Sequence, residues 1–347
     1  MRFGYFDEAN KEYVIDRPDT PAPWANYLGS PEYGAIISNN AGGYSFVKSG
    51  ANGRIIRYVF NNFDQPGRYI YIRDNKSNDF WSASWQPVGK ALDVYKSECH
   101  HGTGYTNIMA SYSKIDSEAL YYVPLDKTHE VWKVKLTNNS NEERDLSVFG
   151  YCEFTNDNNY EQDQVNLQYT LFITKTYFDK NRITQVINEN VKNNAINDSK
   201  VVKRVFGLVG ADVASYCGDK EEFLGRYHSY ANPVAVENGN CGNKLNYNIN
   251  ACGALETKLT LKPGESKEFA FVLGMKDDDE ADEIMASYND VAKKSVDEIA
   301  ELKDYWHSKL NHLQVKTPSE AFNAMINTWN ACQCFMTFIW SRAASFS

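Results

Sequence analysis

Apolar and polar positions alternate along most of the chain, from Tyr5 to about Met275. Runs in which every second residue is apolar or aromatic are separated by turn residues, and this period of two predicts short β-strands. Clear examples are residues 68–73, 130–136 and 267–274. Because hardly any helical periodicity interrupts this region, the pattern predicts a large antiparallel β-sandwich.

Two segments repeat one pattern of strand, short polar turn and strand. In the segment Val131–Val148 the turn is Asn138–Asn141, and in Leu255–Leu273 it is Lys262–Glu265. Both patterns predict hairpins of the sandwich. The Asn-rich segment Thr184–Asp198 fits either a loop or an edge strand.

The pattern changes after Met275, where apolar residues begin to recur at every third or fourth position. This period predicts an amphipathic helical connector over Ala281–Leu310. The acidic run Asp277–Glu280 stands at the start of that helix, where negative charge interacts favourably with the helix dipole. We therefore interpret the run as a helix start and not as a metal site.

A second helix is predicted after the start signal Thr317–Glu320, and apolar residues cover most of its circumference. A helix of that kind must be buried. The chain stops at Ser347, soon after the apolar run 335–340, which leaves that surface with nothing after it to pack on. We therefore expect the chain to be the N-terminal portion of a longer protein.

The composition of the chain argues against some classes of function. The formal net charge of −9 and the pI of about 5.3 argue against nucleic-acid binding, which requires a concentrated basic surface. No apolar run is long enough to span a membrane, and the N-terminus lacks a secretory signal, so a cytoplasmic protein is expected. Aromatic residues make up 14% of the chain, which suits strands first and sugar-stacking surfaces second.

Candidate chemistry is sparse when the residues are considered alone. The seven cysteines lack the spacing of a zinc site, so no metal site is predicted. His100 and His101 are adjacent on a predicted strand and should point to opposite faces, so they cannot easily serve one site. No catalytic residue can be nominated, because single residues far apart in sequence carry no geometric information. A carbohydrate-binding β-sandwich without chemistry of its own therefore stays open as a hypothesis.

Motifs along the whole chain resemble those of one enzyme family in order and in spacing. They include Arg2-Phe3-Gly4-Tyr5-Phe6-Asp7, Asn39-Asn40-Ala41-Gly42-Gly43-Tyr44, His101-Gly102-Thr103-Gly104-Tyr105, Asn232-Pro233-Val234-Ala235 and Trp340-Ser341-Arg342-Ala343. The family that they resemble is glycoside hydrolase family 94, the inverting phosphorylases of β-linked sugars. The resemblance is to the N-terminal portion of the cellobiose phosphorylase type.

The resemblance implies an architecture that the strand and helix patterns also support. A super-β-sandwich would occupy residues 1–275, a helical linker residues 276–312, and the start of an (α/α)6 catalytic barrel residues 313–347. The expected fold is therefore mainly β: a large antiparallel super-β-sandwich followed by a helical linker and the first helix of the barrel.

The resemblance also implies a reaction, in which phosphate cleaves a β-linked disaccharide with inversion. Cellobiose would give α-glucose 1-phosphate and glucose, with chitobiose or cellodextrin as alternative substrates and water-dependent hydrolysis as a further alternative. Arg342 matches a position that the family uses for phosphate and the adjoining sugar subsite. The general acid would lie beyond Ser347, so the fragment should be inactive alone and contains no catalytic residue. No cofactor is expected, because inorganic phosphate is a co-substrate.

Family members resemble one another in forming homodimers, in which the N-terminal region helps to form the neighbour's active-site entrance. The loop Asn40–Tyr44 is a candidate for that contact, because its glycines allow close backbone approach. The alternative is an ordinary hairpin turn. The expected partners are thus a β-linked disaccharide, phosphate and a second copy of the chain, with no nucleic acid and no membrane.

Overall fold

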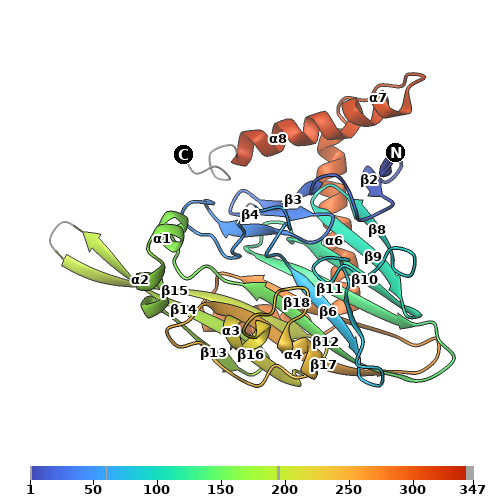
Figure 1. Cartoon of the computed structure of the whole chain (residues 1–347). Helices are drawn as coiled ribbons and strands as arrows, with labels where there is room; N and C mark the ends of the chain where they lie inside the picture. The colour runs from blue at the N-terminus through green and yellow to red at the C-terminus, as the bar shows by residue number, and fades with distance from the viewer. Residues whose placement is uncertain (1, 60, 194–195, 341–347) are drawn as a thin grey trace.

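The computed structural model describes residues 2–59, 61–193 and 196–340, in which the strands form three antiparallel sheets (Figure 1). The ten-stranded sheet has the order β1 (Gly4–Asp7), β2 (Glu12–Ile15), β8 (Lys96–His101), β9 (Tyr105–Tyr112), β10 (Ile115–Tyr122), β11 (His129–Asn138), β18 (Ser266–Gly274), β15 (Ile196–Val209), β14 (Arg182–Asn193), β13 (Thr174–Asp179). The five-stranded sheet has the order β16 (Ser215–Asp219), β17 (Ala251–Leu261), β12 (Arg144–Glu153), β6 (Tyr69–Asp74), β7 (Phe80–Ser82). The small sheet consists of β3 (Ala25–Ser30), β4 (Tyr33–Ser38) and β5 (Gly43–Val47).

The main core lies between the inner faces of the ten-stranded and five-stranded sheets. Trp132 of β11, Phe206 of β15 and Phe271 of β18 are fully buried there and contact one another through their rings, Trp132 and Phe206 at 5.0 Å between centroids. Ile72 and Val148 contribute to the same cluster from the opposite sheet. The predicted antiparallel sandwich is confirmed, because alternate residues of each sheet meet in one apolar layer.

The two predicted hairpins are wrong in their pairing, although their strands are present. Each turn carries the chain from one sheet to the other: β11 belongs to the ten-stranded sheet and β12 to the five-stranded one, and β17 and β18 cross in the reverse direction. The resulting arches lie side by side, since β11 pairs with β18 and β12 pairs with β17. The period of two establishes that two strands follow each other, but it does not say whether they pair or stack across a core.

A buried asparagine joins the two arches. Asn138 receives a backbone hydrogen bond from Gly264 and donates one to Glu265, both in the turn of the other arch. Its side-chain Nδ2 donates to the carbonyl of Leu261 at 2.9 Å, and its Oδ1 accepts from the backbone N–H of Ser140 at 2.9 Å. The side chain therefore satisfies backbone groups that the turns leave unpaired in the interior.

The Asn-rich segment Thr184–Asp198 forms strand and not loop wherever the structure describes it. β14 and β15 pair from Arg182 with Gly207 to Asn193 with Ile196, so the two strands make one long hairpin. Figure 1 shows this hairpin reaching beyond the rest of the sandwich. β13 pairs with β14 only as far as Ile187, and it is β13 that forms the edge of the sheet.

The helices up to the end of the linker have the bounds α1 (Tyr160–Val165), α2 (Leu167–Ile173), α3 (Lys220–Leu224), α4 (Val234–Asn238), α5 (Asp278–Ser287) and α6 (Val291–Leu310). The linker is therefore two helices and not the single connector that the period predicts. Asp290 accepts a hydrogen bond from the backbone N–H of Lys293 at 3.0 Å and so begins a new helix. The acidic run is confirmed as a helix start, because Asp277 and Glu280 form a capping box on α5.

The linker helices pack on the outer face of the ten-stranded sheet. Met285, Tyr288 and Leu302 form an apolar cluster with Tyr122 and Val131 of the strands. Gly207 lets α5 approach closely, since a Cβ there would lie 2.3 Å from the methyl carbon of Met285. Val296, which the period places on the apolar face, is 65% exposed because the break between the helices changes their phase.

The last described segment contains α7 (Glu320–Ala324), a π-helical turn (Met325–Trp329) and α8 (Asn330–Trp340). This segment lies across the end of α6, apart from the main sheets (Figure 1). Trp306 packs edge-on against Phe335 with ring centroids 5.1 Å apart, and Asn327 donates to Glu8 at 2.9 Å. The first helix after the linker is thus attached both to α6 and to the N-terminal turn. The domain limits at 275 and 312 stay a prediction.

Candidate functional site

Arg342, the side chain that the resemblance assigns to phosphate and sugar, lies outside the residues that the structure describes. The description ends at Trp340, the last residue of α8. The contacts of Arg342 stay a prediction. The structure does describe two other places where sequence reasoning puts candidate residues, the loop Asn40–Tyr44 and the histidine pair.

The loop Asn40–Tyr44 joins β4 to β5 and is folded against a buried carboxylate. Ala41 and Gly43 have φ angles of 62° and 113°, and a Cβ on Gly42 would lie 2.3 Å from the carboxylate of Asp64. Ser38 donates to Asp64 through its hydroxyl. The loop is therefore a tight hairpin turn, and its glycines do allow the close approach that was expected. A contact with a neighbouring subunit stays a prediction.

Asp64 sits in an apolar setting that disfavours its charge. Burial raises the pKa of the Asp64 carboxyl, although hydrogen bonds from Ser38 and Tyr58 partly offset the rise. The Tyr58 hydroxyl lies 3.0 Å from Oδ1 of Asp64. Because its donors come from the same hairpin and the segment that follows β5, Asp64 holds the loop in place.

The two adjacent histidines point to opposite faces of β8, as predicted. His101 faces inward, where its Nε2 donates to the carbonyl of Trp24 at 2.8 Å and its Nδ1 lies 2.9 Å from the hydroxyl of Thr106. Burial lowers the pKa of His101 to about 4, so the ring is neutral at pH 7. His101 therefore acts as a structural link between β8 and the β3 segment.

His100 faces outward and lies between two carboxylates. Its Nδ1 is 2.7 Å from Glu12 of β2, and its Nε2 is 2.6 Å from Glu98 of β8. Hydrogen bonding to Glu12 is the main reason that the pKa of His100 rises to about 9, so the ring is charged at pH 7. Both ring nitrogens are occupied, so the group holds strands together and offers no free position for proton transfer.

Two more groups complete this ion cluster and connect it to the linker. Tyr105 of β9 donates its hydroxyl to Glu12, and Lys303 of α6 lies 4.0 Å from the same carboxylate oxygen. The ammonium group of Lys303 also lies 4.8 Å from the centroid of the Tyr105 ring. Sequence reasoning missed the cluster because Glu12 and His100 are far apart along the chain, and only the strand order brings β2 beside β8.

A second buried ion network lies next to the five-stranded sheet. Arg57 binds Asp163 through two nitrogens, at 3.1 and 2.7 Å, and Glu153 at 3.0 Å. Burial would raise the pKa of Glu153, but Lys220 and Arg57 outweigh it, so the pKa is lowered. Tyr230 donates to the second oxygen of Glu153. All these groups are satisfied by one another, which is typical of a structural network.

The described residues contain no group of three or more His, Cys, Asp or Glu side chains placed to hold a metal ion. Within the same ranges, no helix combines the length and the apolar character that crossing a membrane requires. The side-chain clusters of the described portion are thus ion networks that hold strands and helices together.

Two family models match the chain. The model described as "Glycosyl hydrolase 94, supersandwich domain" matches residues 11–291, and the model described as "Glycosyl hydrolase 94 superfamily, catalytic domain" matches residues 305–347. The first match covers the sheets from β2 onward and all of α5, and the second begins within α6. Together they confirm the expected fold class, including the start of the helical barrel.

Two curated relatives match along the whole chain. The "N,N'-diacetylchitobiose phosphorylase" of Vibrio proteolyticus is 38% identical over 348 residues, and the protein of the same name from Vibrio furnissii is 37% identical over 347 residues. Each alignment covers 100% of this chain and 42% of the relative. The chain therefore spans less than half the length of these relatives.

A solved structure agrees with the architecture. A bacterial glucoamylase complexed with acarbose superposes with a TM-score of 0.52 over 94% of this chain and 44% of that chain, at 9% sequence identity. A likeness at this identity concerns the fold alone.

Proposed function

The chain belongs to glycoside hydrolase family 94, and from that membership we propose that it is the N-terminal part of an inverting β-glycoside phosphorylase. The observation that supports the proposal is the match of the supersandwich model over residues 11–291, followed in the same chain by the catalytic-domain match over residues 305–347. Inorganic phosphate is the proposed co-substrate, and no further cofactor is proposed.

In the proposed reaction an oxygen of phosphate attacks the anomeric carbon from the face opposite the glycosidic oxygen. A carboxylic acid protonates that oxygen as the bond to carbon breaks, so a β-linked disaccharide gives an α-sugar 1-phosphate and a free sugar. Phosphate already carries negative charge, so it needs donors and positive charge around it rather than a base. Arg342 is proposed to supply both, because a guanidinium group can donate two parallel hydrogen bonds to one phosphate.

We assign the general acid to the part of the relatives that this chain does not cover. The alignment leaves more than half of each relative without a counterpart here, and the catalytic-domain match is short, residues 305–347. A leaving sugar oxygen departs slowly without protonation, so the chain alone is expected to be inactive.

For the substrate, the relatives favour N,N'-diacetylchitobiose over cellobiose, which the sequence motifs had put first. Both relatives at 37–38% identity carry the name of chitobiose phosphorylase. The proposed products are therefore α-N-acetylglucosamine 1-phosphate and N-acetylglucosamine, with cellobiose as the second substrate to test.

The test incubates the complete product of the gene, and separately this chain, with each disaccharide and phosphate. The complete product should form sugar 1-phosphate only when phosphate is present, and the chain alone should form none. Sugar release that does not depend on phosphate would indicate hydrolysis. Absence of sugar 1-phosphate from both disaccharides would contradict the proposed function.

The role of Arg342 can be tested with a change that keeps its charge. Arg342→Lys in the complete product should raise the KM for phosphate about tenfold or more, because an ammonium group loses the two parallel hydrogen bonds. Arg226→Lys is the matched control, since Arg226 is an exposed arginine after α3. Equal kinetic constants for the two variants would contradict the assignment.

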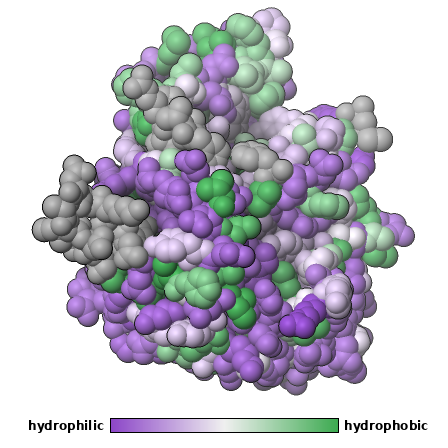
Figure 2. Space-filling model, turned by 60° about the vertical axis from the view of Figure 1, so that its left-hand side comes forward, coloured by the Kyte–Doolittle hydropathy of each residue, from purple (hydrophilic) through white to green (hydrophobic). Residues whose placement is uncertain are grey.

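We also propose that the protein is cytoplasmic and forms a homodimer. The apolar surface of α1 and α2 is proposed to take part in the dimer contact. Val165 and Phe172 are each 70% exposed, and Leu167 lies between them. Figure 2, which turns this side of the molecule forward, shows hydrophobic residues grouped near the middle of the face. Phe172→Asp should convert the dimer to a monomer in light scattering, whereas an unchanged mass would rule out this surface.

A further inference from the structure

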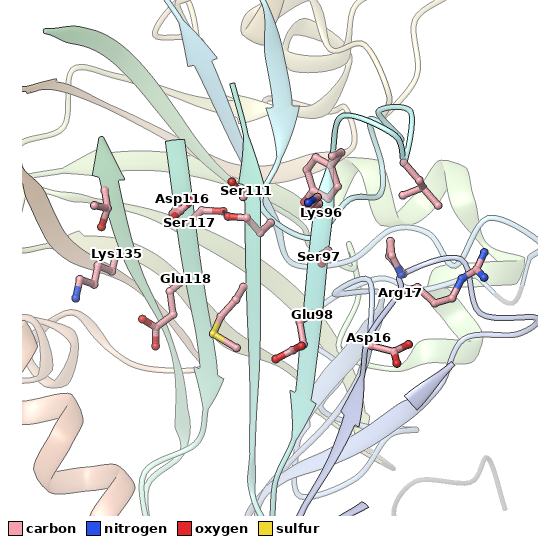
Figure 3. Close-up of a pocket in the computed structure, with 16 residues that line it drawn as sticks. Asp16, Arg17, Lys96, Ser97, Glu98, Ser111, Asp116, Ser117, Glu118 and Lys135 are labelled. Atoms are coloured by element: carbon pink, nitrogen blue, oxygen red, sulfur yellow. Dashed lines mark hydrogen bonds between the residues drawn. The ribbon is translucent and has the colours of Figure 1, made fainter. Parts of the chain in front are cut away.

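An open groove of about 850 Å³ lies on the outer face of the ten-stranded sheet (Figure 3). Its floor is formed by β8, β9 and β10, with β11 along one side and the segment Asp16–Pro18 along the other. The linker helices pack on the outer face nearer the opposite ends of these strands, around Tyr105, Tyr122 and Val131. The volume falls in the range of small-molecule and oligosaccharide sites.

A row of side chains crosses the floor of the groove. The register places Glu98 opposite Met109, Met109 opposite Glu118, and Glu118 opposite Lys135. Neighbouring strands are about 4.8 Å apart, so Glu98 and Glu118 stand about 10 Å apart with the methionine between them. Figure 3 shows Glu98, Glu118 and Lys135 projecting from three strands at a similar level.

The charges along the groove nearly cancel. Its acidic side chains are Asp16, Glu98, Asp116 and Glu118. Its basic side chains are Arg17, Lys96 and Lys135. A polyanion would meet the four carboxylates and a polycation the three bases, so the lining favours a neutral ligand that both donates and accepts hydrogen bonds.

Three of the carboxylates are held in place by neighbours. Asn107 donates to Glu118 at 3.1 Å, Asn139 donates to Asp116 at 2.6 Å, and His100 lies 2.6 Å from Glu98. Each of these contacts uses one carboxylate oxygen, and within the described ranges the second oxygen stays available to accept from a ligand. Fixed acceptors lower the entropy lost on binding.

We propose that this groove binds a neutral β-linked oligosaccharide. Sugar hydroxyls would donate to Glu98 and Glu118 and accept from Lys96, and the apolar side of a sugar ring would lie on Met109 and Leu92. The spacing of the two glutamates is close to the length of a disaccharide unit. The class of ligand rests on the proposed function, since the sugar-processing family is what points to oligosaccharides rather than other neutral polyols.

The test is calorimetric titration of the 347-residue chain with chitotetraose (fully N-acetylated) and with cellotetraose, in buffer without phosphate. Glu118→Gln keeps the side-chain shape and should weaken binding about tenfold, the effect of losing one charge-assisted hydrogen bond. Ser111→Trp fills the groove from β9 and should abolish binding. Glu222→Gln, an exposed glutamate of α3 beside the other sheet, is the matched control and should bind like the parent chain.

The outcomes separate the groove from the proposed function. Binding by the parent chain that both groove variants weaken supports the site, provided that circular dichroism shows each variant folded. No binding of either tetrasaccharide, or equal binding by all four proteins, overturns it. The titration contains no phosphate and measures binding, whereas the assay of the proposed function measures turnover. A phosphorylase whose groove binds no sugar would fail the titration and pass the turnover assay, and a sugar-binding protein without phosphorylase activity would do the reverse.

Discussion

The outer face of the ten-stranded sheet has two ends that differ in chemistry, although the same strands run through both. Under α6, β10 presents Leu120 and Tyr122, and β11 presents Val131. At the groove end the same faces of these two strands carry Glu118 and Lys135 instead. Side chains alternate between the inner and the outer face along the whole of each strand. What changes from one end to the other is the type of residue on the outer face.

This difference shows what a strand pattern does and does not encode. The inward positions of these two strands are buried along the whole strand and are mostly apolar, with Ser117, Glu130 and Asn138 as the polar exceptions. The outward positions of β10 and β11 are apolar beneath the linker helices, and at the groove end they include Asp116, Glu118 and Lys135. The residue types on the outward face of the strands therefore indicate how far the linker helices cover the sheet. Substitutions at the two ends of the strands can test this relation.

The largest expected effect is at the covered end. Leu302 of α6 is 2% exposed and packs on Tyr105 and Tyr122, so Leu302→Ala should lower the free energy of unfolding by about 2–5 kcal/mol. Met109→Ala at the groove end should cost less than about 1 kcal/mol, because its side chain is only partly buried. Urea unfolding measures both, and equal losses would contradict the comparison.

The next effect concerns the polar contacts beneath α6. Tyr122 donates its hydroxyl to Glu298 at 2.8 Å and lies 3.2 Å from Ser295. Tyr122→Phe should therefore cost about 1–3 kcal/mol in unfolding free energy, since a partly buried carboxylate loses a donor. Tyr5→Phe on the exposed part of β1 is the matched control and should change little. A loss as small as that of the control would show that water reaches Glu298.

A smaller, pH-dependent effect is expected at His100, which lies between the two ends. Its pKa is raised from 6.5 to about 9, so its ion pairs stabilise the fold fully below pH 6.5, and this stabilisation is lost as the pH rises through 9. The groups facing it are Glu12, Glu98, Tyr105 and Lys303.

The measurement at His100 compares the parent with His100→Gln in urea unfolding at several pH values. The gap in unfolding free energy should be largest near pH 6 and close steadily up to pH 9.5. The effect is limited because solvent partly screens the pair. A gap that is constant over this range would mean that the charge of the ring contributes nothing.

Much of the fold can be predicted from the sequence, because burial leaves a regular pattern. The period of two found the strands around Trp132 and Phe271, and the change of period after Met275 found the helices. The two arches could not be found this way, since pairing partners such as β11 and β18 are far apart along the chain. The break between α5 and α6 contains no Gly or Pro, and its signal is the helix-start residue Asp290, which the continuing recurrence of apolar residues outweighed.

The candidate site was less predictable. Opposite faces for His100 and His101 follow from strand geometry and are confirmed. The partner of His100 is Glu12, and nothing in the sequence places β2 beside β8. The role of Arg342 came only from resemblance and lies outside the described residues. The groove was not anticipated either, because its side chains come from four strands that meet only in the folded sheet.

The smallest effect on stability is expected where the largest effect on ligand binding is proposed. Glu118 is partly exposed on the floor of the groove, and Gln keeps its size and can still accept from Asn107. Glu118→Gln should therefore change the unfolding free energy by less than about 0.5 kcal/mol. If the same variant loses tetrasaccharide affinity, the open end of the sheet carries charge for a ligand. A loss of stability like that of Tyr122→Phe would instead mean that Glu118 belongs to the packing of the sheet, and the contrast between the two ends would not hold.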